Sequence, residues 1–220
     1  MEVELSENLR EAFPDIKVAV LEAWNVVNKS FDLGLEGEKR RLEAYIRENY
    51  KNLGNFEVVK SYNRFFKRWG KTYPVQFQVK SIVKGRKIPA RSTLVEAMFM
   101  AELKNLYLTA GHDLDALKGE KLNTRLAEGT EEYVKLNGER QRLEAGDIIT
   151  MDGEGIISSV LYGPDLRTRI TDRTRSCLFF TYFPYGEEDG NIKRHFQNIA
   201  ENIKIFSAEA RFSEAKIFHL

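Results

Sequence analysis

The apolar residues of the chain are most concentrated in residues 92–117. Residues 94–108 are apolar on nearly every side of a helix, which is typical of a buried helix. Thr93 and Glu96 have the spacing of a capping box, which predicts that this helix begins at Thr93. Residues 110–115 then change to small and polar side chains, and we expect them to form a turn.

Before this stretch, the pattern predicts two short strands followed by three helices. Apolar residues recur at three- and four-residue spacing in the helical segments, as expected for helices with one buried face. Gly85 is expected to end the last of these helices, because glycine readily adopts the left-handed conformation that follows a helix. The expected ranges are residues 2–5 and 16–22 for the strands, and residues 36–50, 56–69 and 75–83 for the helices.

After the apolar stretch, the sequence changes to strand patterns. Asn137-Gly138 between two short runs is a strong signal for a β-hairpin. We expect a second hairpin around residues 152–155, a central strand at residues 178–183 and a closing amphipathic helix at residues 191–208. Helices followed by a β-rich half predict an α+β fold, in which the helical part packs on a mixed or antiparallel sheet. We interpret residues 1–220 as one domain, with an N-terminal extension (1–55), a helical basic part (56–118) and a β-rich part (119–220).

The composition is that of an ordinary globular protein and argues against several classes. The 220 residues have a hydrophobic fraction of 42% and a net charge of +1, so the chain can bury a sizeable core and is no polycation as a whole. Cys177 is the single cysteine, which excludes a disulfide framework and favours a reducing, cytoplasmic environment. The acidic N-terminus and the lack of long apolar runs predict neither a signal peptide nor a membrane span. No cofactor is expected.

Positive charge is concentrated in residues 58–95, which contain no Asp or Glu. Cations that cluster without counter-charges attract phosphates, so this segment is the candidate nucleic-acid surface. A solvated helix face is the alternative interpretation. Aromatic residues lie between the cations, but their helical spacing favours a place in the core over stacking on bases. The cations are Lys60, Arg64, Lys67, Arg68, Lys71, Lys80, Lys84, Arg86, Lys87 and Arg91.

Candidate chemistry lies in two short segments. His112 lies beside Asp113 and Asp115, and a histidine near carboxylates can act as a general acid or base at neutral pH. The structural alternative is a capped turn in which the imidazole bonds a backbone carbonyl, and one histidine with two carboxylates falls short of a metal site. Gly163 would let a ligand approach the backbone, although a plain turn explains this segment equally well. Arg167 is a candidate phosphate contact.

The order of these motifs resembles the B3/B4 module of the bacterial phenylalanyl-tRNA synthetase β subunit. In the synthetase, this module hydrolyses mischarged tyrosyl-tRNA in a pocket between its helical and β parts. The resemblance covers about residues 90–185 and implies a B3/B4-type fold, and the full chain is similar to free-standing proteins that carry the module. The residues that carry the resemblance are Glu102-Leu103, His112, Asp115, residues 132–143, residues 146–152, Gly163 and Thr174.

The resemblance implies a set of site residues. His112 would be the catalytic residue that orients or deprotonates a water, and amides near Gly163 would receive the oxyanion. The chain departs from the module where Glu96-Ala97 replaces a Thr-Asn pair and where Phe179 or Phe180 replaces a Glu. The implied substrate-binding residues are Glu96, Glu102, Asp115, Gly163, Thr174 and Phe180. The candidate RNA contacts come from the basic segment and from the turn after Gly163, and they are Lys67, Arg68, Lys71, Lys84, Lys87, Arg91 and Arg167.

We therefore expect a tRNA-binding protein whose catalytic form would be a deacylase of mischarged aminoacyl-tRNA acting in trans. The alternative is a non-catalytic RNA- or amino-acid-binding module, which an apolar residue in place of the Glu favours. A third possibility is a small-molecule enzyme that uses the same pocket. The sequence lacks a Gly-rich ATP loop and the motifs of an aminoacylating core, so an ATP-dependent ligase is not expected. The oligomeric state stays open.

Overall fold

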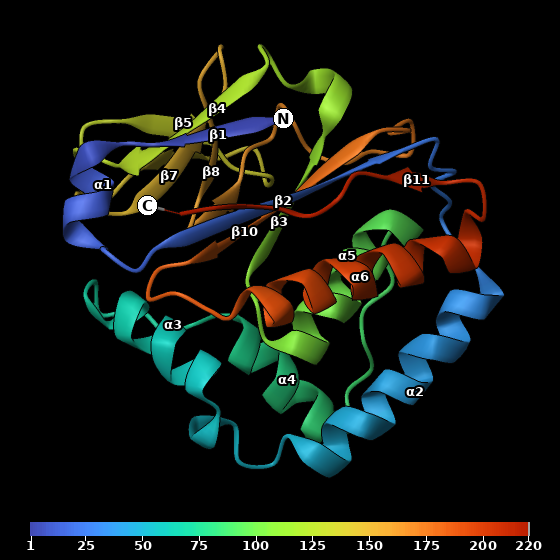
Figure 1. Ribbon diagram of the computed structural model, residues 1–220. Helices are drawn as coiled ribbons and strands as arrows, with labels where there is room; N and C mark the ends of the chain where they lie inside the picture. The colour runs from blue at the N-terminus through green and yellow to red at the C-terminus, as the bar shows by residue number, and fades with distance from the viewer. Residues whose placement is uncertain (220) are drawn as a thin grey trace.

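The computed structural model describes residues 1–219 and confirms the α+β fold. The helices α2 to α6 lie together on one side of the sheets (Figure 1). The helices are α1 (Glu7–Ala12), α2 (Leu33–Asn49), α3 (Glu57–Lys67), α4 (Val75–Val83), α5 (Thr93–Asn105) and α6 (Asp189–Phe206), with short 3-10 turns η1 (Leu53–Asn55) and η2 (Leu114–Ala116). The strands are β1 (Glu2–Leu5), β2 (Lys17–Trp24), β3 (Thr109–Asp113), β4 (Lys121–Leu126), β5 (Glu132–Val134), β6 (Arg140–Arg142), β7 (Ile148–Met151), β8 (Ile156–Ser159), β9 (Gly163–Pro164), β10 (Cys177–Phe183), β11 (Arg211–Phe212) and β12 (Lys216–Phe218).

Two sheets and a separate hairpin organise the strands. One sheet has the order β11-β2-β10-β3, with β12 also paired to β2. β10 pairs antiparallel with β2 and with β3, and all its residues are buried, which confirms the predicted central strand. The other sheet has the order β1-β4-β7-β8-β9, in which β1 runs parallel to β4. The N-terminal residues thus supply one strand to each sheet.

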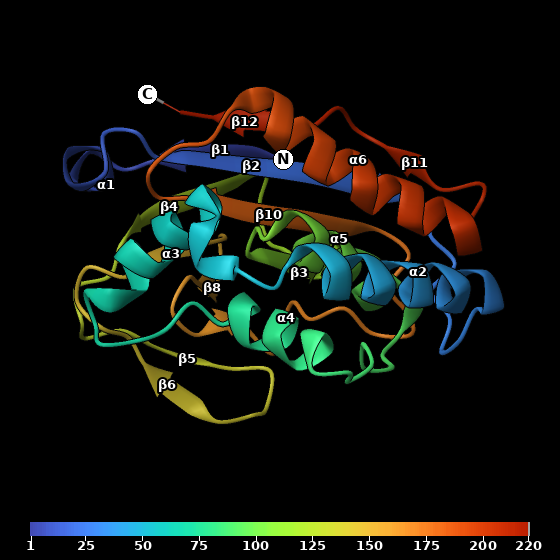
Figure 2. The same cartoon turned by 90° about the horizontal axis from the view of Figure 1, so that it is seen from below.

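The predicted buried helix, α5, lies at the centre of the helical layer. It contacts α2, α4 and α6 as well as β3, and Figure 2 shows it between α4 and α6. Leu94, Ala97, Ala101 and Leu103 are all fully buried. A helix surrounded in this way needs apolar residues on every side, which explains the pattern of its sequence.

The end of α4 and the predicted hairpins follow their local sequence signals. Gly85 has φ +92°, in the left-handed region that favours glycine. The Gly85 amide donates to the Ile82 carbonyl at 2.9 Å, and the Arg86 amide donates to the Ser81 carbonyl at 3.0 Å. These two bonds form a Schellman motif, which stops the helix as predicted. The hairpins β5–β6 and β7–β8 are likewise confirmed.

Residues 110–115 do not form the predicted turn. Residues 109–113 are strand β3, in which His112 pairs with Leu178 of β10. Small side chains are needed here for a different reason: a Cβ on Gly111 would lie 2.8 Å from Ile170 Cδ1 and 2.9 Å from Met98 Sδ. The small residues therefore admit neighbouring side chains to the strand.

The predicted capping box at the start of α5 is also wrong. Ser92 is the N-cap, and the Thr93 hydroxyl accepts from the Lys29 amide at 3.0 Å. Glu96 accepts from the Arg91 amide at 2.7 Å. The start of the helix is thus held by the segment before α2 and by the loop before α5. The strands β4, β9, β11 and β12 were not predicted, and the last two follow the predicted closing helix.

Among the helices of residues 1–219, none combines the length and apolar character that a membrane crossing requires.

Candidate functional site

His112 lies on β3 in the interior of the protein, with none of its surface exposed. Its Nδ1 atom lies 2.7 Å from the hydroxyl oxygen of Thr168. That hydroxyl donates its own hydrogen to Asp165 Oδ1, so His112 Nδ1 must be the donor in the first bond. Nε2 then carries the lone pair, and it has no hydrogen-bond partner among residues 1–219.

The electrostatics of this position keep the imidazole neutral. Burial lowers the pKa of His112 to about 4; the negative charge of Asp152 opposes this shift, and the positive charge of Arg167 adds to it. Burial also raises the pKa of Asp165, although Thr168 and Arg167 stabilise its charge. A neutral imidazole with a free lone pair can accept a proton or a hydrogen bond. His112 therefore has the electronic character of a base but lacks solvent contact in this conformation.

Arg167 completes this cluster from the outside. Its guanidinium donates to Asp152 Oδ1 at 2.8 Å and to the Ala116 carbonyl at 3.0 Å. It also lies 3.6 Å from a carboxylate oxygen of Glu154 and 3.8 Å from one of Asp165. Three carboxylates thus compensate its charge. The structure places Arg167, a predicted RNA contact, within the network around His112.

A second polar contact lies at the end of β3. The Thr174 hydroxyl, which is buried, donates to Asp113 Oδ2 at 2.6 Å. The Asp115 amide donates to Asp113 Oδ1 at 3.1 Å, while the Asp115 side chain is exposed. Asp113, rather than Asp115, is therefore the carboxylate that joins this strand to residues 171–174.

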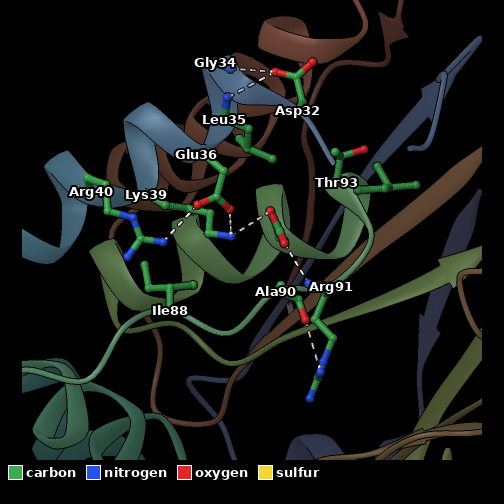
Figure 3. Close-up of polar contacts among 12 residues, drawn as sticks. Asp32, Gly34, Leu35, Glu36, Lys39, Arg40, Ile88, Ala90, Arg91 and Thr93 are labelled. Atoms are coloured by element: carbon green, nitrogen blue, oxygen red, sulfur yellow. Dashed lines mark hydrogen bonds and ion pairs between the residues drawn. The ribbon is translucent and has the colours of Figure 1, made fainter. Parts of the chain in front are cut away.

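The two glutamates of α5 bond to different partners. Glu96 accepts from the Arg91 amide and forms an ion pair at 3.1 Å with Lys39, whose side chain is fully buried. Figure 3 shows Lys39 between α2 and α5, where it also contacts Glu36. Glu102 accepts from the Thr109 amide at 2.8 Å, and burial raises the pKa of Glu102 to about 8. Within residues 1–219, neither glutamate bonds to His112, so both serve contacts between elements of the fold.

Gly163 and Phe180 contrast in their accessibility. Gly163 has φ +86°, and a Cβ there would meet nothing within 4 Å among the described residues. Its carbonyl accepts from the Tyr133 hydroxyl at 2.8 Å. Phe180 is fully buried and pairs with Ala110 across the sheet. Gly163 thus keeps an open backbone face, whereas Phe180 contributes to the core.

The predicted basic surface is divided into cations with and without partners. Arg68 lies over the ring of Phe13 at 4.8 Å, and Lys71 lies over the ring of Tyr162 at 4.7 Å. Lys60 forms an ion pair with Glu57 at 2.6 Å. In contrast, Lys67, Lys84, Arg86, Lys87 and Arg91 are exposed and form no ion pair with any acid of residues 1–219.

Most aromatic residues of the same segment behave as their spacing predicts. Tyr62, Phe65, Phe66 and Tyr73 are buried, and the rings of Tyr62 and Tyr73 stack at 4.4 Å between centroids. These side chains belong to the core. A cavity of about 880 Å³ opens beside them, lined by residues that include Lys17, Arg64 and Tyr185 but not His112.

Sequence reasoning missed the partners of His112 and one further buried acid. The local sequence around Thr168 and Asp165 predicted only a turn and gave no indication that these residues bond to His112. Asp147 is fully buried, accepts from the Ser159 hydroxyl at 2.5 Å, and has its pKa raised to about 7 by burial. Only the apolar residues that follow Asp147 in the sequence could have suggested that it is buried.

Known proteins resemble the chain in sequence family and in fold. A family model described as the B3/4 domain matches residues 62–188. The fold is similar to an N-terminal fragment of the phenylalanyl-tRNA synthetase beta subunit from Pyrococcus horikoshii, with a TM-score of 0.50 and 12% sequence identity. The similarity covers 96% of this chain and 50% of that fragment, so the chain spans about half its length. No curated protein matches the chain. Because the B3/4 match covers more than half of its residues, this protein belongs to the B3/4 domain family.

Proposed function

We propose that this protein binds RNA, with tRNA as the class of partner, through the exposed cations of residues 67–91. The observation that carries the proposal is that Lys67, Lys84, Arg86, Lys87 and Arg91 are exposed and form no ion pair with an acid within residues 1–219. Because no intramolecular carboxylate competes for them, these cations keep their full attraction for phosphates. Their concentration in a chain of net charge +1 requires segregation of charge along the sequence.

The choice of tRNA is supported by the family and by the fold. The similar fragment belongs to a protein named as a tRNA synthetase subunit. An RNA whose phosphates bind this surface could bring its end to the β-rich part of the fold. No adenylate-forming chemistry is included in the proposal, and the protein would act on tRNA that is already charged.

Binding can be tested by titrating labelled tRNA with the purified protein at several salt concentrations. We expect the logarithm of the association constant to fall linearly with the logarithm of salt, with a slope of about −0.9 per phosphate contacted on a duplex. Replacement of Lys84 and Lys87 by Gln should reduce this slope. No detectable tRNA binding at about 50 mM salt would contradict the proposal.

Hydrolysis of mischarged aminoacyl-tRNA is the second candidate function. It is favoured by the free lone pair of His112 Nε2, which could take a proton from the attacking water. Because the imidazole is fully buried, this reaction requires a local opening that admits the ester to Nε2. An aminoacyl ester is labile, so positioning of the water would supply much of the acceleration.

A deacylation assay with a panel of mischarged tRNAs tests this candidate. His112→Asn is the informative variant, because an Asn side chain can still donate to Thr168 but has no counterpart of Nε2. We expect the wild type to deacylate at least one mischarged tRNA and His112→Asn to slow that reaction at least tenfold, about 1.4 kcal/mol. Binding of tRNA without any rate above the uncatalysed one would leave the non-catalytic binding module.

A further inference from the structure

We propose that the exposed face of α4 and the loop after it bind a single-stranded end of the RNA, with Phe77 stacked on an unpaired base. Lys84, Arg86 and Lys87 would hold the neighbouring phosphates. This inference rests on the proposed function, and it names the part of the RNA that the surface recognises.

Phe77 is unusual among the aromatic residues of the basic segment. It is 54% exposed, whereas Tyr62, Phe65, Phe66 and Tyr73 are buried and Trp69 is half-buried. The other apolar residues of α4 face inward, since Val75, Val79 and Ile82 are buried. Phe77 therefore contributes little to the core, and its ring presents an open surface beside the cations.

Helical geometry places Phe77 and the first loop cation on the same side. Lys84 follows Phe77 by seven positions, about two turns of helix or about 10 Å along the axis. Lys80 and Ser81 lie one turn after Phe77 on this face. Within residues 1–219, the Lys80 side chain has a hydrogen bond only to Gln76, at 3.5 Å. The Phe77 ring and the cations of Lys80 and Lys84 thus lie in one line along α4 that continues into the loop.

The loop cations have no other role in the fold. Lys84, Arg86 and Lys87 are exposed, and no side-chain hydrogen bond, ion pair or ring contact connects them to the rest of residues 1–219. Two cations of α3 differ, since Lys60 pairs with Glu57 and Arg64 lies over the ring of Tyr185 at 4.2 Å. The loop is therefore the part of the basic segment that is most available to a ligand.

The backbone of the loop is nevertheless held firmly. The Schellman motif at Gly85 fixes its start. Two buried carboxylates hold its end: Glu43 of α2 accepts from the Ile88 amide at 2.7 Å, and Glu96 of α5 accepts from the Arg91 amide at 2.7 Å. A rigid backbone reduces the conformational entropy that the loop would lose on binding. The carboxylates thus position the cations without neutralising them.

The combination of a bare ring with cations selects for unpaired RNA. Cations alone attract the phosphates of duplex and single-stranded RNA alike. An exposed aromatic face can stack only on a base that is not already stacked and paired, and such stacking tolerates any base. Phe77 therefore favours a single-stranded end over a duplex.

Fluorescence anisotropy with the full-length protein and two RNA probes tests the inference. The probes are a single strand of mixed sequence, about 12 nucleotides long, and the duplex that it forms with its complement. Phe77→Leu removes the aromatic face but keeps an apolar side chain. The matched control is Phe31→Leu, the same substitution at an exposed phenylalanine that lies outside the basic segment.

We expect Phe77→Leu to weaken binding of the single strand about tenfold and to leave duplex binding unchanged. Phe31→Leu should change neither. The double variant Lys84→Gln with Lys87→Gln should reduce the salt slope for the single strand by about 1.4, at about 0.7 per phosphate. Lys118→Gln with Lys193→Gln, which removes two exposed lysines elsewhere, should leave that slope unchanged.

Three results would overturn the inference while the proposed function stands. The first is tRNA binding in which Phe77→Leu matches the wild type on the single strand. The second is a preference of the wild type for the duplex probe. The third is competition by an acidic peptide as strong as that by the single strand, which would assign the surface to protein partners. Failure to bind any RNA, tRNA included, would instead remove the proposed function and this inference together.

Discussion

The interior around β3 and the loop of residues 84–91 are both rich in polar groups, yet they use them in opposite ways. In the interior, side chains such as His112, Thr168 and Asp165 bond to one another and are removed from solvent. In the loop, the backbone bonds to Glu43 and Glu96 while the cationic side chains stay in solvent. Buried polar groups are needed by the fold, whereas exposed groups without partners are available to a ligand.

The largest expected effect concerns Lys39, a buried cation that pairs with Glu96, the carboxylate that holds the end of the loop. Lys39→Met removes the charge that compensates Glu36 and Glu96 and leaves Glu96 buried without its ion pair. Breaking a buried pair from one side destabilises a protein by about 3–5 kcal/mol. We expect a loss of this size in the free energy of unfolding, measured by urea denaturation at pH 7.

The partner and an exposed pair provide the controls for Lys39. Lys39→Met combined with Glu96→Gln should recover much of the loss, because no buried charge is then left alone at Glu96. Lys60→Met breaks an exposed pair with Glu57 and should change stability by less than about 1 kcal/mol. Equal effects at Lys39 and Lys60 would show that the interior network has no special role.

The next effect comes from Glu102, whose pKa burial raises to about 8. Between about pH 4.5 and pH 8 the unfolded state releases this proton while the folded state retains it, so wild-type stability should fall as pH rises through this window. Glu102→Gln cannot ionise but can still accept from the Thr109 amide. We expect it to reduce the fall by on the order of 3 kcal/mol, measured by urea denaturation at pH 5 and pH 8. An unchanged pH dependence would contradict the burial of a protonated acid.

His112 should show the opposite pH dependence. Its pKa is lowered to about 4 by burial, so between about pH 6.5 and pH 4 the unfolded state takes up a proton that the folded state does not. Its contribution to stability is thus complete above about pH 6.5 and decreases as pH falls through the window. His112→Asn should reduce this decrease by on the order of 2 kcal/mol in urea denaturation at pH 7 and pH 4.5. The same decrease in wild type and variant would show that His112 is accessible to protons.

The difference between the two regions also explains what the sequence could predict. Gly85 ends α4 and Asn137-Gly138 forms its hairpin because both signals act within a few residues. The family resemblance predicted the fold from the order of such local motifs. The loop cations could be recognised for the same reason, since charge segregation is visible along the chain.

The interior could not be predicted because its contacts are distant in sequence. His112 was expected in a turn, and it became part of a strand through pairing with Leu178 of β10. Arg167 was expected to contact RNA, and its ion pair with Asp152, fifteen residues earlier in the chain, could not be read from its local sequence. β4 pairs with β1 and β7, more than twenty residues away on either side. Tertiary contacts decide the state of such residues, and their local sequence carries little information about it.

The smallest expected effect on stability is at the loop itself. Lys84→Gln combined with Lys87→Gln removes two cations that have no partner in the described chain, so the free energy of unfolding should change by less than about 0.5 kcal/mol. Any change should be stabilising at low salt, because the four cations of residues 84–91 repel one another, and it should vanish when salt screens them. Lys17→Gln is the contrasting variant, because Lys17 donates to the Glu187 carbonyl and to Asp189, each at 2.7 Å. Removing these two bonds should lower the free energy of unfolding by about 1 kcal/mol. Urea denaturation at low and high salt measures both variants. A loss above about 1 kcal/mol for the loop variant would mean that these side chains support the fold and are not held free for a ligand.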